Sequence, residues 1–260
     1  MSAPDHSPQR EGTLPPQPVR WGMVAAIVGL AVASALIGAQ YLLARAPWIP
    51  RSDGVAVTFQ VVFYAIVLAF LIVVAKRRGL GSLRRDFGFE LKWIDLLIGI
   101  GLAVAVQIAD ALIYYFAINV LRLPVAPTGN LVLPKERWLA VLDGLAVAAF
   151  FAPIVEELFF RGLVMRAIRN LVIRRAKFEG PPTTRRAARI SVVVSAAIFA
   201  AGHLYESRNL TMLFVLGVSI FVFGLITGAI ATRTGRLGPS MMTHMLTNGF
   251  GIVVLLSTTN

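Results

Sequence analysis

The segment APIVEELFFRG, residues 152–162, places two adjacent carboxylates, Glu156 and Glu157, inside an apolar run that extends from residue 139 to residue 165. An unpaired carboxylate in a bilayer or a protein interior costs several kcal/mol, so two adjacent acids at this position indicate chemistry. Arg161 follows Glu157 by four residues and therefore lies on the same face of a helix. We expect Arg161 to neutralise Glu157 locally, which leaves Glu156 available.

The composition around this segment is that of an integral membrane protein: 57% of the 260 residues are hydrophobic, 15% are charged, and the mean hydropathy is +0.74. Apolar runs of about 20 residues, long enough to cross a bilayer as helices, cover residues 21–43, 55–75, 93–121, 138–165 and 211–231, and shorter runs cover 190–204 and 241–256. The sequence predicts an all-α, polytopic transmembrane helix bundle of seven spans, or eight if Pro153 divides the fourth run. The first run is too long for a cleaved signal peptide.

The net charge of +12 is distributed in a way that predicts topology and not nucleic-acid binding. With the N-terminus inside, eighteen of the 25 Lys and Arg residues are cytoplasmic: two before residue 21, six in 76–92, eight in 166–189 and two in 233–236. Six lie on the other side and Arg161 is intramembrane. This asymmetry follows the positive-inside rule, so we expect a multi-pass protein of the cell (inner) membrane with a cytoplasmic N-terminus. The two basic loops would contact anionic lipid headgroups.

Three parts of the chain are predicted. Residues 1–20 contain five prolines and no apolar periodicity, which predicts a disordered cytoplasmic tail. Residues 21–137 form transmembrane scaffold helices, and residues 138–260 form a catalytic transmembrane core. The basic segment 166–189, interrupted by Gly180-Pro181-Pro182, is interpreted as a cytoplasmic hinge. The absence of cysteine excludes disulfides, thiolate nucleophiles and Cys-based metal sites.

Three further polar residues lie in apolar surroundings: His203, His244 and Asn248. At 1.5 Å per residue from the nearest cytoplasmic arginine, Glu156 and His203 lie about 20 Å deep, and the other two about 12 to 18 Å deep. His244 and Asn248 are four residues apart and share a helical face, as do Phe199 and His203. Polar groups at matched depth on three helices predict one intramembrane polar cavity.

Three aspartates are assigned supporting positions. Asp95 lies near a helix entrance, where we expect only interfacial contacts. Asp110 and Asp143 lie deeper, where we expect hydrogen bonds to neighbouring helices or a part in gating.

The order Glu156-Glu157-x-x-x-Arg161, Phe199-x-x-x-His203 and His244-x-x-x-Asn248 resembles the CPBP family. This family comprises type II CAAX prenyl endopeptidases and the bacteriocin-processing or self-immunity proteins formerly called Abi. The resemblance covers about residues 138 to 256 and includes flanking residues such as Ala152-Pro153 and Thr234-Gly235.

The resemblance implies an intramembrane endopeptidase of the glutamate type that acts on membrane-associated peptides or on prenylated, CAAX-like proteins. It implies that Glu156 and His203 activate a water, and that His244 and Asn248 stabilise the oxyanion. Glu157, Arg161 and Phe199 would support them. General-base and oxyanion chemistry need these residue types. No cofactor, no bound metal and no nucleic acid is expected.

Three alternatives remain open. Glu and His are zinc ligands, so a metalloprotease that uses the same residues is possible, although His-Glu-x-x-His is absent. A non-catalytic membrane scaffold or bacteriocin immunity protein would bind a peptide without cutting it. A transporter would use the acids as a proton relay. The run 190–204 is about 22 Å long as a helix, so we expect it to end inside the protein, with residues 205–209 lining a polar cavity near His203.

Overall fold

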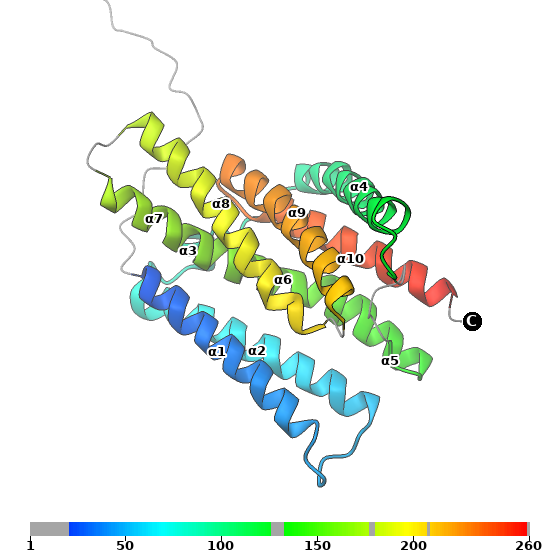
Figure 1. Ribbon diagram of the computed structural model, residues 1–260. Coiled ribbons are helices and arrows are strands. Elements are labelled where there is room, and N and C mark those ends of the chain that lie inside the picture. The colour runs from blue at the N-terminus through cyan, green and yellow to red at the C-terminus, as the bar shows by residue number, and fades with distance from the viewer. Residues whose placement is uncertain (1–20, 126–132, 177–179, 207–208, 259–260) are drawn as a thin grey trace, which may run out of the picture.

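The computed structural model describes residues 21–125, 133–176, 180–206 and 209–258, and every regular element in these ranges is a helix (Figure 1). The elements of the first half are α1 (Met23–Leu43), α2 (Asp53–Arg78), α3 (Leu83–Phe87), α4 (Ile94–Tyr115) and the π-helical η1 (Phe116–Val120). The predicted all-α class is confirmed. The predicted tail, residues 1–20, lies outside the described residues.

The second half begins with one long helix that runs through five consecutive elements, here called the central helix. These are α5 (Arg137–Val141), η2 (Leu142–Phe151), α6 (Ala152–Glu157), η3 (Leu158–Val164) and α7 (Met165–Arg175), of which η2 and η3 are π-helical. Then follow α8 (Pro181–His203), the 3-10 turn η4 (Leu204–Glu206), α9 (Leu210–Thr234) and α10 (Gly238–Thr258). Pro153 lies within the central helix, so the fourth apolar run is one helix and not two.

Local sequence explains where several helices begin and end. Ser52 and Asn209 cap α2 and α9 by accepting hydrogen bonds from backbone amides three residues later. The last turn of α2 carries Lys76, Arg77 and Arg78, whose charge favours the negative end of the helix dipole. α9 ends at Gly235, whose φ of 70° is the left-handed conformation that glycine adopts at low cost.

Six helices in the described part of the chain are long and apolar enough to cross a membrane. They are α1, α2, α4 with η1, the central helix, α9 and α10. α8 has 23 residues but is not among these six; its first half contains Arg185, Arg186 and Arg189. In Figure 1, α8 nevertheless runs antiparallel to α9 and packs along it.

The central helix occupies the middle of the bundle. In an apolar 18-residue stretch of the central helix 44% of the residues are buried, against 11% in the corresponding stretch of α1 and 17% in that of α4 with η1. It packs against α1, α2, α8 and α10. Side chains in the middle of the central helix are therefore surrounded by protein. The exposed apolar side chains of α1 and α4, by contrast, are suited to contact with lipid.

At one end of the bundle four charged residues join distant segments, and we call them the end cluster: Asp86, Asp95, Arg166 and Arg236. Asp86 accepts hydrogen bonds from the backbone amides of Leu80 and Ser82, and Asp95 forms an ion pair with Arg236. Arg166 donates to the carbonyl oxygen of Gly235 over 2.9 Å. Asp95 is fully buried, so the expectation of purely interfacial contacts was wrong.

The segment 166–189 is mostly helical. α7 continues to Arg175, and α8 begins at Pro181, whose missing N–H costs nothing in the first turn of a helix. A long hinge loop was therefore the wrong interpretation, and the connection is limited to residues 176–180.

Candidate active site

The two adjacent glutamates of the central helix face different surroundings. Successive residues of a helix point about 100° apart, so Glu156 and Glu157 cannot share one environment. The Glu157 side chain is completely buried, whereas that of Glu156 is 14% exposed and lines a cavity. This difference separates a structural carboxylate from an accessible one.

Glu157 is held by a cation on its own helix. Arg161 Nη1 lies 3.2 Å from Glu157 Oε1, and Arg161 Nη2 donates to Thr227 Oγ1 over 2.6 Å. The guanidinium also lies over the ring of Phe199, 4.3 Å from its centroid. A buried charge pair is tolerated when such additional partners surround it. The structure thus places Arg161 against Glu157, as the four-residue spacing suggested.

Two histidines from different helices converge on one oxygen of Glu156. His203 Nε2, from the end of α8, lies 3.9 Å from Glu156 Oε2, and His244 Nε2, from α10, lies 3.7 Å from the same atom. Both distances are too long for a direct hydrogen bond. One water molecule can lie within hydrogen-bonding distance of Oε2 and of a histidine nitrogen at this separation.

The other ring nitrogen fixes the tautomer of each histidine. His203 Nδ1 lies 2.8 Å from the carbonyl oxygen of Phe199, and His244 Nδ1 lies 3.2 Å from Glu157 Oε1. Both partners only accept, so each Nδ1 carries the hydrogen. A neutral imidazole then presents a lone pair at Nε2. His244 can therefore donate a hydrogen bond toward Glu156 only after it gains a proton.

Aromatic side chains hold the rings in place. Phe199 is 2% exposed, and its ring centroid lies 4.5 Å from that of His203 and 6.0 Å from that of His244. Phe223 of α9 packs against His244 with centroids 4.7 Å apart. Phe199 thus contacts both histidines and Arg161.

Asn248 contacts the central helix about two turns before the glutamates. Its Nδ2 donates to the carbonyl oxygen of Ala148 over 2.9 Å. In the π-helical stretch each amide bonds five residues back, as Ala152 does to Val147, so the partner of Ala148 would be residue 153. That residue is Pro153, which has no N–H. Asn248 therefore satisfies a carbonyl that the proline leaves without a backbone donor, and its second amide hydrogen is left for another acceptor.

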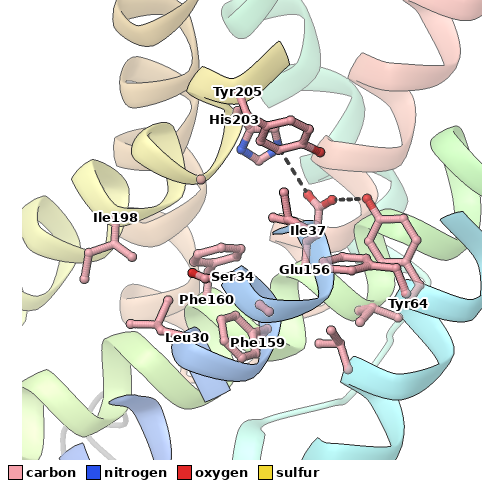
Figure 2. Close-up of a pocket in the computed structure, with 15 residues that line it drawn as sticks. Leu30, Ser34, Ile37, Tyr64, Glu156, Phe159, Phe160, Ile198, His203 and Tyr205 are labelled. Carbon is pink, nitrogen blue, oxygen red and sulfur yellow. Dashed lines mark hydrogen bonds and ion pairs between the residues drawn. The ribbon is translucent and has the colours of Figure 1, made fainter. Parts of the chain in front are cut away.

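A cavity of about 110 Å³ lies on one side of Glu156, between α1, α2, the central helix and α8. Figure 2 shows Glu156 and His203 at this cavity, together with Tyr205 from η4. Tyr205 was expected to line it. Ser207 and Arg208, which belong to the same expectation, lie outside the described residues. Most other lining residues are apolar, Leu30, Ile37 and Ile198 among them.

Sequence reasoning missed the tyrosine that contacts Glu156. The hydroxyl group of Tyr64 on α2 donates to Glu156 Oε1 over 2.6 Å, as the dashed line in Figure 2 marks. A signal was available: Tyr64 is twelve residues before Lys76, about 18 Å deep at 1.5 Å per residue. This is the depth assigned to the other polar groups, whereas tyrosine in a span usually lies at the membrane interface.

Among the described residues no group of three or more His, Asp or Glu is placed to hold a metal ion. A tetrahedral zinc would need its ligand atoms about 3.3 Å apart, closer than the 3.7 and 3.9 Å observed here. The free Nε2 lone pairs are nevertheless of the kind that binds zinc.

Comparison with protein families gives a match to the second half of the chain. Residues 138–250 match a family model described as type II CAAX prenyl endopeptidase Rce1-like. No curated protein and no solved structure matches the chain. The matched segment includes Glu156, His203, His244 and Asn248 and ends within α10, while α1, α2 and α4 lie outside it.

Proposed function

Because residues 138–250 match the family model of Rce1-like type II CAAX prenyl endopeptidases, a family of proteases, we propose that this membrane protein is an intramembrane endopeptidase. Its substrates would be membrane-associated peptides or lipidated, CAAX-like proteins. The observation that carries the proposal is the approach of two histidine nitrogens, from α8 and α10, to within 4 Å of one oxygen of Glu156. A carboxylate and an imidazole around one water-sized position are what general-base hydrolysis requires.

In the proposed reaction a water between Glu156 Oε2 and His203 Nε2 gives a proton to Glu156. The water oxygen bonds to the peptide carbonyl carbon, and the carbonyl electron pair moves onto its oxygen. When this tetrahedral species collapses, the carbon–nitrogen bond breaks and Glu156 returns the proton to the leaving amine. The products are a carboxylic acid and an amine, and Glu156 ends in its starting state.

The oxyanion would be stabilised by Asn248 and His244. Asn248 has a second amide hydrogen beyond the one on Ala148, and donors of this kind favour negative charge that develops on the carbonyl oxygen. His244 would contribute as an imidazolium, because its Nδ1–H is already directed to Glu157. The proposal thus assigns His244 a proton that the sequence argument did not require.

We also propose that seven helices cross the cell membrane, with α8 as the seventh and the N-terminus inside. α8 lies along α9 through most of its length, and the end cluster gathers the basic connections at one end of the bundle. Because the chain has no cysteine, single cysteines can be introduced for labelling. An impermeant maleimide should label Ser257→Cys in intact cells but not Arg85→Cys. The reverse pattern, or equal labelling, would refute this topology.

Zinc-dependent hydrolysis is the second candidate, and the histidine tautomers favour it. Both Nδ1–H groups are hydrogen-bonded to acceptors, as in zinc-bound histidines, and both Nε2 lone pairs face Glu156. Closure of the site by a few tenths of an ångström would bring these atoms to the spacing of zinc ligands. Glu156 and both histidines would then hold the ion, which would supply an activated water.

The test uses the purified full-length protein in detergent and a quenched fluorescent peptide with a farnesylated Cys-aliphatic-aliphatic-X end. We expect hydrolysis by the wild type and none above background by Glu156→Gln; equal activity of the two proteins would refute the proposal. The unprenylated peptide shows whether the lipid is required. Activity lost on chelation and restored by zinc would select the metal mechanism. If the peptide is not cut, proteins trapped on Glu156→Gln in membranes can be identified by mass spectrometry. If no protein is enriched on this variant relative to the wild type, the non-catalytic membrane scaffold would be favoured over the protease.

A further inference from the structure

The two oxygens of the Glu156 carboxylate have different partners. Oε2 faces His203 and His244 across gaps of 3.9 and 3.7 Å, whereas Oε1 accepts the hydroxyl hydrogen of Tyr64 over 2.6 Å. A hydroxyl donor this close to a carboxylate forms a strong, charge-assisted hydrogen bond. The carboxylate is therefore anchored through one oxygen, and the other is free to act on water.

This anchor matters because a carboxylate group is not fixed by its own rotamer. The terminal torsion of a glutamate is broad, so an unanchored group would rotate and exchange its two oxygens. General-base catalysis depends on the acceptor atom being within hydrogen-bonding reach of the water. Without the hydroxyl of Tyr64, Oε2 would face the histidines for only part of the time.

The ring of Tyr64 is itself held by neighbours on two helices. Its centroid lies 5.1 Å from that of Phe63 on α2 and 6.2 Å from that of Phe151 on the central helix, both in edge-to-face geometry. Phe151 is only five residues before Glu156. The tyrosine is thus packed against the same helix that carries the carboxylate it contacts.

We propose that Tyr64 is a positioning residue for the hydrolytic reaction, which directs Glu156 Oε2 toward the reacting water. This inference rests on the proposed function and assigns a role in it to α2, outside the segment 138–250 that matches the protease family. The part of the chain assigned as scaffold from sequence therefore supplies a group to the site. The matched segment does not contain everything that orients its general base.

The first experiment measures kcat and KM of full-length Tyr64→Phe on the farnesylated peptide. Loss of a hydrogen bond to a charged group should lower kcat about 10- to 100-fold, with KM within about twofold of wild type because no substrate contact is removed. Tyr41→Phe makes the same chemical change on an exposed tyrosine of α1 and should leave both constants unchanged. An active wild type with unchanged kcat in Tyr64→Phe would overturn the inference while the proposed function stands.

A second measurement does not depend on activity. The infrared difference spectrum between wild type and Glu156→Gln isolates the carboxylate bands of Glu156. Repeating the subtraction in the Tyr64→Phe background should shift these bands, because the carboxylate has lost a short hydrogen bond. Unchanged bands would overturn the inference even if kcat fell, since the loss would then arise elsewhere. A wild type that cuts no substrate, with shifted bands, would refute the proposed function and leave the Tyr64 contact as its own finding.

Discussion

Two buried charged clusters in this molecule differ in how completely their groups are bonded. In the end cluster Asp86 accepts three backbone hydrogen bonds and one from Trp21, and Asp95 bonds to Arg236 and to the amide of Lys92. Around Glu156 Oε2, by contrast, the two histidine Nε2 atoms stand at 3.7 and 3.9 Å, and a cavity adjoins the carboxylate.

The number of hydrogen-bond acceptors left unfilled distinguishes a structural charge from a reactive one in a membrane protein. Both clusters are too costly to be accidental. A cluster whose acceptors are all filled stabilises the fold and has no capacity left for a reactant. A cluster with a free lone pair, an open position and an accessible side chain can bind and activate one.

The largest effect is expected at Glu156. Glu156→Gln keeps the shape but cannot accept a proton, so the hydrolysis rate should fall by about 10² to 10⁴. The thermal midpoint of the purified protein should stay the same or rise, because a buried charge is removed. Rates and midpoints are measured on the same preparation.

The matched control is the same chemical change in the end cluster. Asp95→Asn leaves Arg236 without its buried partner and should reduce the free energy of unfolding by about 1 to 3 kcal/mol, while kcat per folded molecule is retained. The contrast would fail if Asp95→Asn abolished catalysis in folded protein, or if Glu156→Gln were as active as the wild type.

Arg161 should give the next largest effect, on stability. Arg161→Ala leaves Glu157 as an unpaired buried charge, and such a loss costs about 3 to 5 kcal/mol. We expect little folded protein in the membrane, measured by fluorescence-detected size exclusion.

A double variant tests the cause. Glu157→Met together with Arg161→Met removes both charges at similar volume and should restore folded yield. Hydrolysis should stay low, because His244 has lost the carboxylate that orients its ring. Equal yields of the single and double variants would show that the charge pair is not what Arg161 contributes.

Asn248 is assigned both a catalytic role, as a donor to the oxyanion, and a structural role, as the donor to the Ala148 carbonyl. Its variants separate these two roles. Asn248→Ala should lower kcat about 10²- to 10³-fold through loss of an oxyanion donor. It should also reduce stability by about 1 to 3 kcal/mol, because the carbonyl of Ala148 loses its donor.

Pro153→Ala restores a backbone N–H opposite that carbonyl. In this background Asn248→Ala should cost less stability than in the wild type, while the loss of kcat should persist. If restoring the N–H also restored kcat, Asn248 would act through the helix and not on the oxyanion.

The sequence predicted the helices well because hydrophobic length is a local property. The apolar runs agree with α1, α2, α4, the central helix, α9 and α10 to within a few residues at most ends. Matched depth also indicated that His203 and His244 share a site with Glu156. Depth follows from counting along one helix, so it needs no knowledge of neighbours.

What the sequence could not supply is which helix faces which. Asp95 and Arg236 are 141 positions apart, and nothing in either local segment shows that they pair. Tyr64 was missed for the same reason: its depth was legible, but its contact with Glu156 depends on the packing of α2 against the central helix. The donor to the Ala148 carbonyl, for which Pro153 has no N–H, is Asn248, a hundred residues later.

The smallest effect is expected at the edge of the end cluster. Trp21→Phe removes the hydrogen bond from Nε1 to Asp86, 3.3 Å long, while a phenyl ring can still pack against Phe87. Asp86 keeps its backbone donors, so the free energy of unfolding should fall by only about 0.5 to 1.5 kcal/mol, with kcat unchanged. Trp138→Phe is the control, because Trp138 is 64% exposed and its hydrogen bond to Glu136 competes with water; it should not shift the thermal midpoint. A several-fold fall in kcat for Trp21→Phe would mean that the end cluster is energetically coupled to Glu156. A charge cluster whose acceptors are all filled could then still affect catalysis.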